Sequence, residues 1–171
     1  MRDLLIRAAA LTLMLAATSL AAAAAEPTAV GLWEKRGQSG MPDAWFRIIN
    51  CNGIYLGRIV KLFATAGQNP SGWRCTQCKD DQRNAPVLGI TFIKGMRRQG
   101  LTYQDGSILD PRDGSVYDAQ MQLTSDGQQL TVRGYLGIPL LGQSEVWHRL
   151  PDSAEPSRRF ASCPRGPGAP I

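Results

Sequence analysis

The sequence predicts an all-β protein, a small antiparallel β-barrel with short helical or loop insertions. Two observations point to it: short apolar runs alternate with polar residues at period two, and turn signals built on glycine separate these runs. A third is that the chain after its apolar start has no long segment of helical period. Successive hairpins in about 120 residues favour closure of the sheet into a cylinder, because closure removes exposed strand edges.

The first 25 of the 171 residues have the layout of a secretory signal peptide. Arg2 and Arg7 flank a short basic start, and an Ala-rich apolar run follows and ends in small side chains. We expect cleavage after Ala25. The alternative is a membrane anchor, which needs about 20 apolar residues and firmer flanks. No cysteine lies near this site to carry a lipid. The sequence therefore predicts a periplasmic or secreted protein whose mature chain has no transmembrane span.

The remaining chain divides into a barrel domain, residues 26–150, and a tail, residues 151–171. The tail is rich in Pro, Gly, Ser and Ala and has no apolar period, so we expect it to be flexible. The formal net charge is +5, but the basic residues are scattered rather than gathered in a patch. This pattern argues against nucleic-acid binding. The sequence does not indicate an oligomeric state.

Hairpins account for most of the barrel domain. Asn52-Gly53 lies between two apolar runs, and this dipeptide is a strong hairpin signal because both residues tolerate positive φ. Asp126-Gly127 predicts a second turn, after which Leu130 and Val132 resume the alternation. The last strand is expected at residues 143–150. The inward face of the strand before Asp126 is predicted to carry Tyr117, Ala119, Met121 and Leu123.

The stretch DGSILDPRDGSVYD, residues 105–118, also predicts turns. We interpret Asp105-Gly106 and Asp113-Gly114 as hairpin turns, since Asp accepts bonds from nearby amides and Gly supplies the left-handed conformation. A calcium loop is the alternative, but the acidic spacing fails and the terminal Glu is missing. The segment at residues 64–85 predicts a long polar loop, and the apolar run that follows, 86–96, fits either a strand or a helical turn with a strand.

Several motifs together resemble a bacterial exported family catalogued as domain of unknown function 2147. They are GLW at residues 31–33, PVLG at 86–89, GSILDPRDGSVYDAQMQL and LTVRGYLGIPLLGQSEVWHRL. The resemblance implies a lipocalin-like barrel, for which binding of a small apolar or amphipathic ligand is the usual proposal. Such barrels carry Gly-x-Trp on the first strand and Arg on the last. Trp33 and Arg149 match these places and are expected to close one end of the barrel by stacking.

Four cysteines remain, and an oxidising compartment makes disulfides the default. Family members often carry a second Cys five residues after the position of Cys51, but here that place is Leu56. Of three pairings we favour Cys75–Cys78 with Cys51–Cys163. A redox pair or a zinc site at Cys75 and Cys78 are the alternatives; the first needs an activated thiolate and the second needs two further ligands.

The sequence contains no nucleophile elbow and no phosphate-binding glycine loop, and its single His148 lies on a predicted strand. We therefore expect a non-enzymatic protein without a cofactor or metal, with no catalytic residues and with ligand-binding residues that the sequence does not identify. The leading hypothesis is an exported barrel that binds a small apolar or amphipathic ligand. The alternatives are a thiol-redox or metal-binding envelope protein and a structural or partner-binding envelope module.

Overall fold

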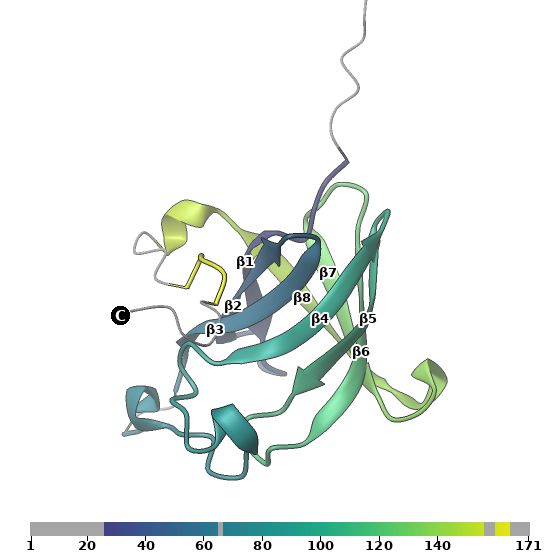
Figure 1. The fold of residues 1–171 in the computed structure, drawn as a ribbon. Helices are drawn as coiled ribbons and strands as arrows, with labels where there is room; N and C mark the ends of the chain where they lie inside the picture. Colours follow the sequence, from purple (N-terminus) through teal and green to yellow (C-terminus); the bar gives the residue numbers. More distant parts are fainter. Residues whose placement is uncertain (1–25, 65–66, 156–159, 165–171) are drawn as a thin grey trace, which may run out of the picture.

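The computed structural model describes residues 26–64, 67–155 and 160–164. The predicted signal peptide and its cleavage site lie outside the described residues. Eight strands in the described chain follow one another around a closed barrel, each antiparallel to the next, and β1 also pairs with β8 (Figure 1). The predicted all-β barrel is confirmed. The strands are β1 (Gly31–Arg36), β2 (Pro42–Cys51), β3 (Ile54–Leu62), β4 (Thr91–Gln99), β5 (Thr102–Leu109), β6 (Val116–Leu123), β7 (Gln129–Tyr135) and β8 (Gln143–Leu150).

Four short 3-10 helices lie in the described connections and after the last strand: η1 (Pro70–Gly72), η2 (Asp80–Gln82), η3 (Pro139–Leu141) and η4 (Asp152–Ala154). The apolar run that fitted either strand or helix becomes β4, preceded by loop. Among the described residues, no helix has the length and apolar character needed to cross a bilayer.

Two of the predicted hairpin turns are confirmed. Asn52 and Gly53 join β2 to β3 with φ of 55° and 86°, and the Gly53 amide donates to Asn50 Oδ1 at 2.8 Å. Between β6 and β7, the Gln128 amide donates to Asp126 Oδ1 at 2.9 Å. Both turns therefore use the side-chain bond and left-handed glycine that their sequences supply.

The interpretation of Asp105-Gly106 as a hairpin turn is wrong. Asp105 has φ of 63° but lies within β5, where the pairing with β6 shifts between Tyr103 and Gly106. The dipeptide thus forms a bulge that bends the strand. A Cβ on Gly106 would lie 2.6 Å from the Lys94 carbonyl oxygen, so the neighbouring strand occupies the space a side chain would need. The turn between β4 and β5 falls instead at Gly100, with φ of 59°.

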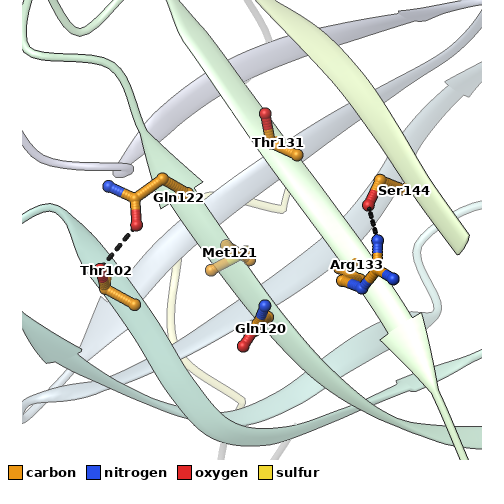
Figure 2. A pocket seen from close by; sticks show the side chains of 7 residues that line it. All are labelled: Thr102, Gln120, Met121, Gln122, Thr131, Arg133 and Ser144. Atoms are coloured by element: carbon orange, nitrogen blue, oxygen red, sulfur yellow. Dashed lines mark hydrogen bonds between the residues drawn. The ribbon is translucent and has the colours of Figure 1, made fainter. Parts of the chain in front are cut away.

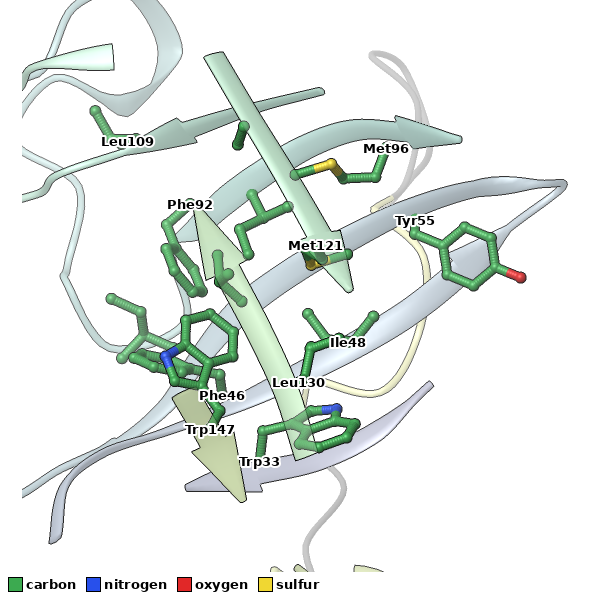
Figure 3. Packing of buried hydrophobic residues seen from close by; sticks show 14 of the residues in the cluster. Trp33, Phe46, Ile48, Tyr55, Phe92, Met96, Leu109, Met121, Leu130 and Trp147 are labelled. Carbon is green, nitrogen blue, oxygen red and sulfur yellow. The ribbon is translucent and has the colours of Figure 1, made fainter. Parts of the chain in front are cut away.

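Inward-facing side chains fill the barrel. On β6 the predicted inward face is confirmed at Ala119, Met121 and Leu123, which are fully or almost fully buried, while Tyr117 is partly buried. Figure 3 shows large apolar side chains from several strands meeting in the interior. Each contributes about 1.5–3 kcal/mol when removed from water. The interior labelled there includes Trp33, Phe46, Ile48, Tyr55, Phe92, Met96, Leu109, Met121, Leu130 and Trp147.

The chain after β8 packs on the outside of the barrel, and we call residues 151–155 and 160–164 the strap. Arg47 on β2 points outward yet is only 4% exposed, because the strap covers it. Its guanidinium donates to Asp152 Oδ1 at 3.0 Å and to Glu155 Oε2 at 2.8 Å. Cys163 forms a disulfide with Cys51 at the end of β2. A buried charge needs partners, and these residues supply them.

These contacts differ from the flexible tail that the sequence predicts from residue 151 onward. Its composition lacks an apolar period, but two carboxylates and one cysteine attach its described part to β2. A Cβ on Gly89 would also lie 2.6 Å from the Phe160 ring, so that ring packs against the loop before β4. The rest of the predicted tail, residues 156–159 and 165–171, lies outside the described residues.

Removing the Cys51–Cys163 disulfide by replacing both residues with Ala is expected to lower the free energy of unfolding by about 5 kcal/mol, since it closes a loop across 112 positions. The same change at Cys75 and Cys78, three positions apart, is expected to cost about 2 kcal/mol. Urea unfolding followed by tryptophan fluorescence measures both. A larger loss for the Cys75 and Cys78 variant would contradict this order.

Candidate functional site

One end of the barrel is plugged by Trp33 and Arg149, which face each other on β1 and β8. Trp33 is fully buried, and its indole N–H donates to the Ala29 carbonyl at 2.8 Å. The Arg149 guanidinium lies 4.2 Å from the centre of the indole ring. The structure thus brings together the two residues that the resemblance assigned to barrel closure.

Arg149 also ties the plug to the backbone of two segments, the residues before β1 and the β6–β7 turn. Its guanidinium donates to the carbonyl oxygens of Thr28 at 2.6 Å and Val30 at 2.9 Å, and to that of Gly127 in the β6–β7 turn. Burial lowers the pKa of Arg149 from its ordinary value. That value is so high that the side chain stays charged near neutral pH. We call this the plugged end, since stacking and hydrogen bonding close it together.

Three aromatic side chains lie toward the opposite end. Phe46 on β2, Phe92 on β4 and Trp147 on β8 are buried and in mutual contact. The ring centre of Phe46 lies 4.3 Å from that of Trp147 and 4.8 Å from that of Phe92. We call these three the aromatic cluster. Their strands were expected from the sequence, but their contact was not, because it depends on the register between distant strands.

The long β3–β4 connection covers this end, and we call residues 67–90 the cap. Cys75 and Cys78 form a disulfide within it and are 0% and 2% exposed. The Cys75 amide donates to the Ala85 carbonyl at 2.9 Å, and Arg74 pairs with Pro86 in an isolated β-bridge. These bonds fold the cap back on itself. Cys75 is thus paired with Cys78, which is the pairing that the sequence favours.

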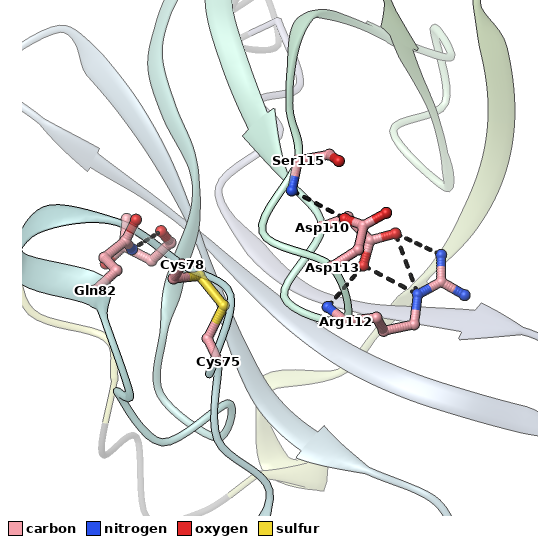
Figure 4. The surroundings of a disulfide bond; sticks show 8 residues. Cys75, Cys78, Gln82, Asp110, Arg112, Asp113 and Ser115 are labelled. Atoms are coloured by element: carbon pink, nitrogen blue, oxygen red, sulfur yellow. Dashed lines mark hydrogen bonds and ion pairs between the residues drawn. A yellow bond between two sulfur atoms is a disulfide. The ribbon is translucent and has the colours of Figure 1, made fainter.

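The β5–β6 turn packs against the cap beside this disulfide, as Figure 4 shows. Gly114 has φ of 74°, and a Cβ there would lie 2.3 Å from the Gln77 carbonyl oxygen. The Ser115 amide donates to Asp113 Oδ1 at 2.9 Å. Asp113-Gly114 therefore forms a turn, as predicted, and its glycine also permits close contact between two loops. The described residues contain no group of three or more His, Cys, Asp or Glu side chains that could hold a metal ion.

Charged side chains form a polar rim near the aromatic cluster. Lys35 on β1 lies 2.8 Å from Glu145 Oε1 and 3.4 Å from Asp43 Oδ2. The Trp147 indole N–H donates to Glu145 Oε2 at 3.3 Å, so one carboxylate joins the rim to the cluster. Asp110 accepts hydrogen bonds from Arg112, and these bonds lower the pKa of Asp110 and raise that of Arg112. The cap end thus places charges beside aromatic surface.

Two hollows lie outside the packed interior. One, of about 440 Å³, lies on the outer face of β5 to β8, where Thr102 bonds to Gln122 and Arg133 bonds to Ser144 (Figure 2). Four of its lining residues are therefore already engaged in side-chain bonds to each other. The other, of about 220 Å³, lies between β3 and the cap and has a mixed lining. Its apolar residues are Val60, Leu62, Pro70 and Leu88, and its polar residues are Lys61, Asn69 and Ser71.

The remaining candidates from the sequence stay apart from the aromatic cluster. His148 is exposed on β8, beside Glu34 of β1. Cys51 and Cys163 hold the strap on the outer wall. Burial of Cys75 and Cys78 within the cap separates them from solvent, whereas a redox-active pair needs an accessible thiolate, usually at a helix N-terminus.

One protein family matches most of the chain. Residues 31–149 match the model of a family described as an uncharacterized protein conserved in bacteria (DUF2147). The chain belongs to this family. Among curated protein sequences, none matches significantly.

A solved structure shares the fold of this family member. It is protein HP1028 from Helicobacter pylori, which is described as belonging to the lipocalin family. The two structures agree with a TM-score of 0.65 over 81% of this chain and 94% of the other, at 16% sequence identity. At that identity the likeness establishes a lipocalin-like barrel and nothing about a shared ligand.

Replacing Arg149 with Lys is expected to lower the free energy of unfolding by roughly 2 kcal/mol, because the ammonium group loses the ring stack and part of the bonding to three carbonyl groups. Guanidinium unfolding measures the loss. Arg97→Lys, at an exposed position of β4, is the matched control and should leave the midpoint unchanged. Equal midpoints for both variants would contradict a role for Arg149 in closure.

Proposed function

We propose that this protein is an exported, non-enzymatic lipocalin-like barrel that binds a small apolar or amphipathic ligand at the cap end. The observation that carries the proposal is the aromatic cluster, which forms the cap-end part of the packed interior, next to the polar rim. The plugged end is closed by the stack of Trp33 and Arg149. A ligand would therefore enter from the cap end.

The hollow between β3 and the cap supports this route. Its wall includes Leu62, which packs against the buried core, so apolar surface continues from the hollow into the barrel. Many backbone hydrogen bonds join one part of the cap to another, while the Gly89 amide and the Ile90 carbonyl bond to Ile59 of β3. These bonds hold the end of the cap on β3, so entry of a ligand would move the part of the cap before Gly89, which the Cys75–Cys78 disulfide keeps folded.

The chemistry of the site favours an amphipathic ligand. Burying about 200 Å² of apolar ligand surface contributes roughly 5 kcal/mol, which supports only weak binding by itself. A charged or polar head could add bonds to Lys35 or Glu145, which are a quarter and a half exposed at the rim. The aromatic cluster would hold the apolar part, and the rim would hold the head.

A second candidate function is a structural or partner-binding envelope module. The observation that favours it is the interior itself, where side chains from all around the barrel already pack together. In this case the barrel stays filled and binding takes place on outer surfaces.

A brominated fatty acid distinguishes these candidates, because bromine quenches tryptophan fluorescence at short range. The wild-type protein should be quenched at saturation, and Trp147→Phe should remove most of the effect. Trp33→Phe, at the plugged end, is the matched control and should keep it. Native mass spectrometry of gently purified protein should also show a bound mass of lipid size. Absence of both quenching and added mass would favour the filled module.

Export is tested separately by the intact mass of the protein recovered from a bacterial envelope fraction. The expected mass corresponds to a chain that begins at Glu26, with two disulfides formed. Protein that keeps residues 1–25 in the cytoplasm would refute export, whatever the barrel binds.

A further inference from the structure

Exposed large apolar side chains in the described chain gather at the cap end. Of those more than a third exposed, all but Val30 and Val146 lie on connections at this end or immediately beside them. They are Met41, Trp73, Val116, Leu136, Ile138, Leu140 and Leu141. Isolated exposed apolar residues are ordinary on a protein surface, but a local concentration marks a binding surface.

The β7–β8 connection carries the densest group, and we call residues 136–142 the apolar loop. Leu136, Ile138, Leu140 and Leu141 are 67%, 54%, 82% and 76% exposed. The loop contains no charged residue and no polar side chain. In Figure 1 it projects from the barrel and carries η3 near its tip.

The loop is held in shape by Arg133 of β7. The guanidinium donates to the carbonyl oxygens of Pro139 and Leu140 and to Ser144 Oγ. Amides of the loop bond within it as well: Ile138 to the Leu136 carbonyl, Leu141 to the Ile138 carbonyl and Gly142 to the Pro139 carbonyl. The apolar side chains are thus presented outward by a backbone that Arg133 and the loop's own hydrogen bonds hold in place.

An exposed apolar loop with a hydrogen-bonded backbone fits a lipid bilayer better than a protein partner. Hydrocarbon offers no hydrogen bonds, so an inserted backbone must satisfy its polar groups internally, and the carbonyls of Leu136, Ile138, Pro139 and Leu140 already have such partners. A stable protein interface needs roughly 800 Å² from each partner, whereas shallow insertion of a few large side chains such as those of this loop suffices at a membrane surface.

A positive net charge favours an anionic surface. Without Arg2, Arg7 and Asp3 of the predicted signal peptide, the formal net charge is +4. This charge belongs to the chain as a whole, because charges nearly balance at the cap end: Arg36 is paired with Glu34, Arg112 with Asp110, and Lys35 with Asp43 and Glu145. Electrostatic attraction to anionic lipid is therefore modest, and burial of the apolar loop supplies most of the binding.

We propose that the apolar loop inserts into the interface of an anionic phospholipid bilayer, with the cap end facing the membrane. The inference goes beyond the proposed ligand binding and does not require it, since a filled barrel could insert the loop equally well. Where both hold, the cap end would face the phase in which an apolar ligand is most concentrated.

Flotation with vesicles made of equal parts phosphatidylglycerol and phosphatidylcholine tests the proposal. The protein is made from its full coding sequence and collected after processing by the cell. The double substitution Leu140→Glu with Leu141→Glu should reduce the bound fraction by at least about tenfold, because two inserted leucines are replaced by anions. Val146→Glu, at an exposed apolar position on the wall of β8, is the matched control and should bind as the wild type does.

Insertion itself is read from a tryptophan placed in the loop. The emission of Leu140→Trp should shift to the blue on vesicle binding and be quenched by brominated phosphatidylcholine, while that of Val146→Trp should not change. Circular dichroism verifies that each variant folds. Equal flotation of wild type and the double variant, or no flotation at low salt, overturns the proposal. Self-association that the double variant abolishes without any vesicle binding also overturns it and identifies a second copy as the occupant.

Discussion

The contact between β1 and β8 is the constraint on which the rest of the structure depends. These strands lie far apart in the sequence, and the sheet becomes a cylinder only when they pair. The Trp33–Arg149 stack lies at that junction and adds side-chain attraction to the backbone ladder. Arg149 reaches the segment before β1 and the β6–β7 turn at the same time, so one side chain fixes closure and plugs an end.

The two ends of the barrel differ in the length of their connections. The plugged end is joined by short turns such as Asn52-Gly53, which leave little chain for binding. The cap end has the long β3–β4 connection, the Asp113-Gly114 turn and the apolar loop. A rigid sheet that carries its longest connections at one end is a common basis for recognition, because loops change without disturbing the core. The aromatic cluster lies beneath those loops, and the described chain has no comparable exposed apolar group at the other end.

The sequence predicted the barrel because its local signals agree with the fold: period two at Ala119, Met121 and Leu123 marks an inward face, and Asn52-Gly53 marks a turn. The prediction of a hairpin turn at Asp105-Gly106 was wrong because the same dipeptide also suits a β-bulge. Only the pairing with the neighbouring strands distinguishes a turn from a bulge. The attachment of the strap through Cys51 and Cys163 follows from the predicted pairing, but its ion pairs with Arg47 were missed because no local pattern reveals the burial of Arg47. The apolar loop was not predicted, because its outward presentation depends on the bonds from Arg133 to its carbonyl groups.

The bond between Cys51 and Cys163 joins the end of β2 to a residue beyond the last strand. Because translation proceeds from the N-terminus, the early hairpins can fold in sequence, but this crosslink must wait until almost the whole polypeptide has been made. The Cys51–Cys163 disulfide therefore forms only after β8 has reached its place in the sheet. A prematurely terminated product, lacking the second thiol, would keep Cys51 free and remain open to mixed disulfides and degradation.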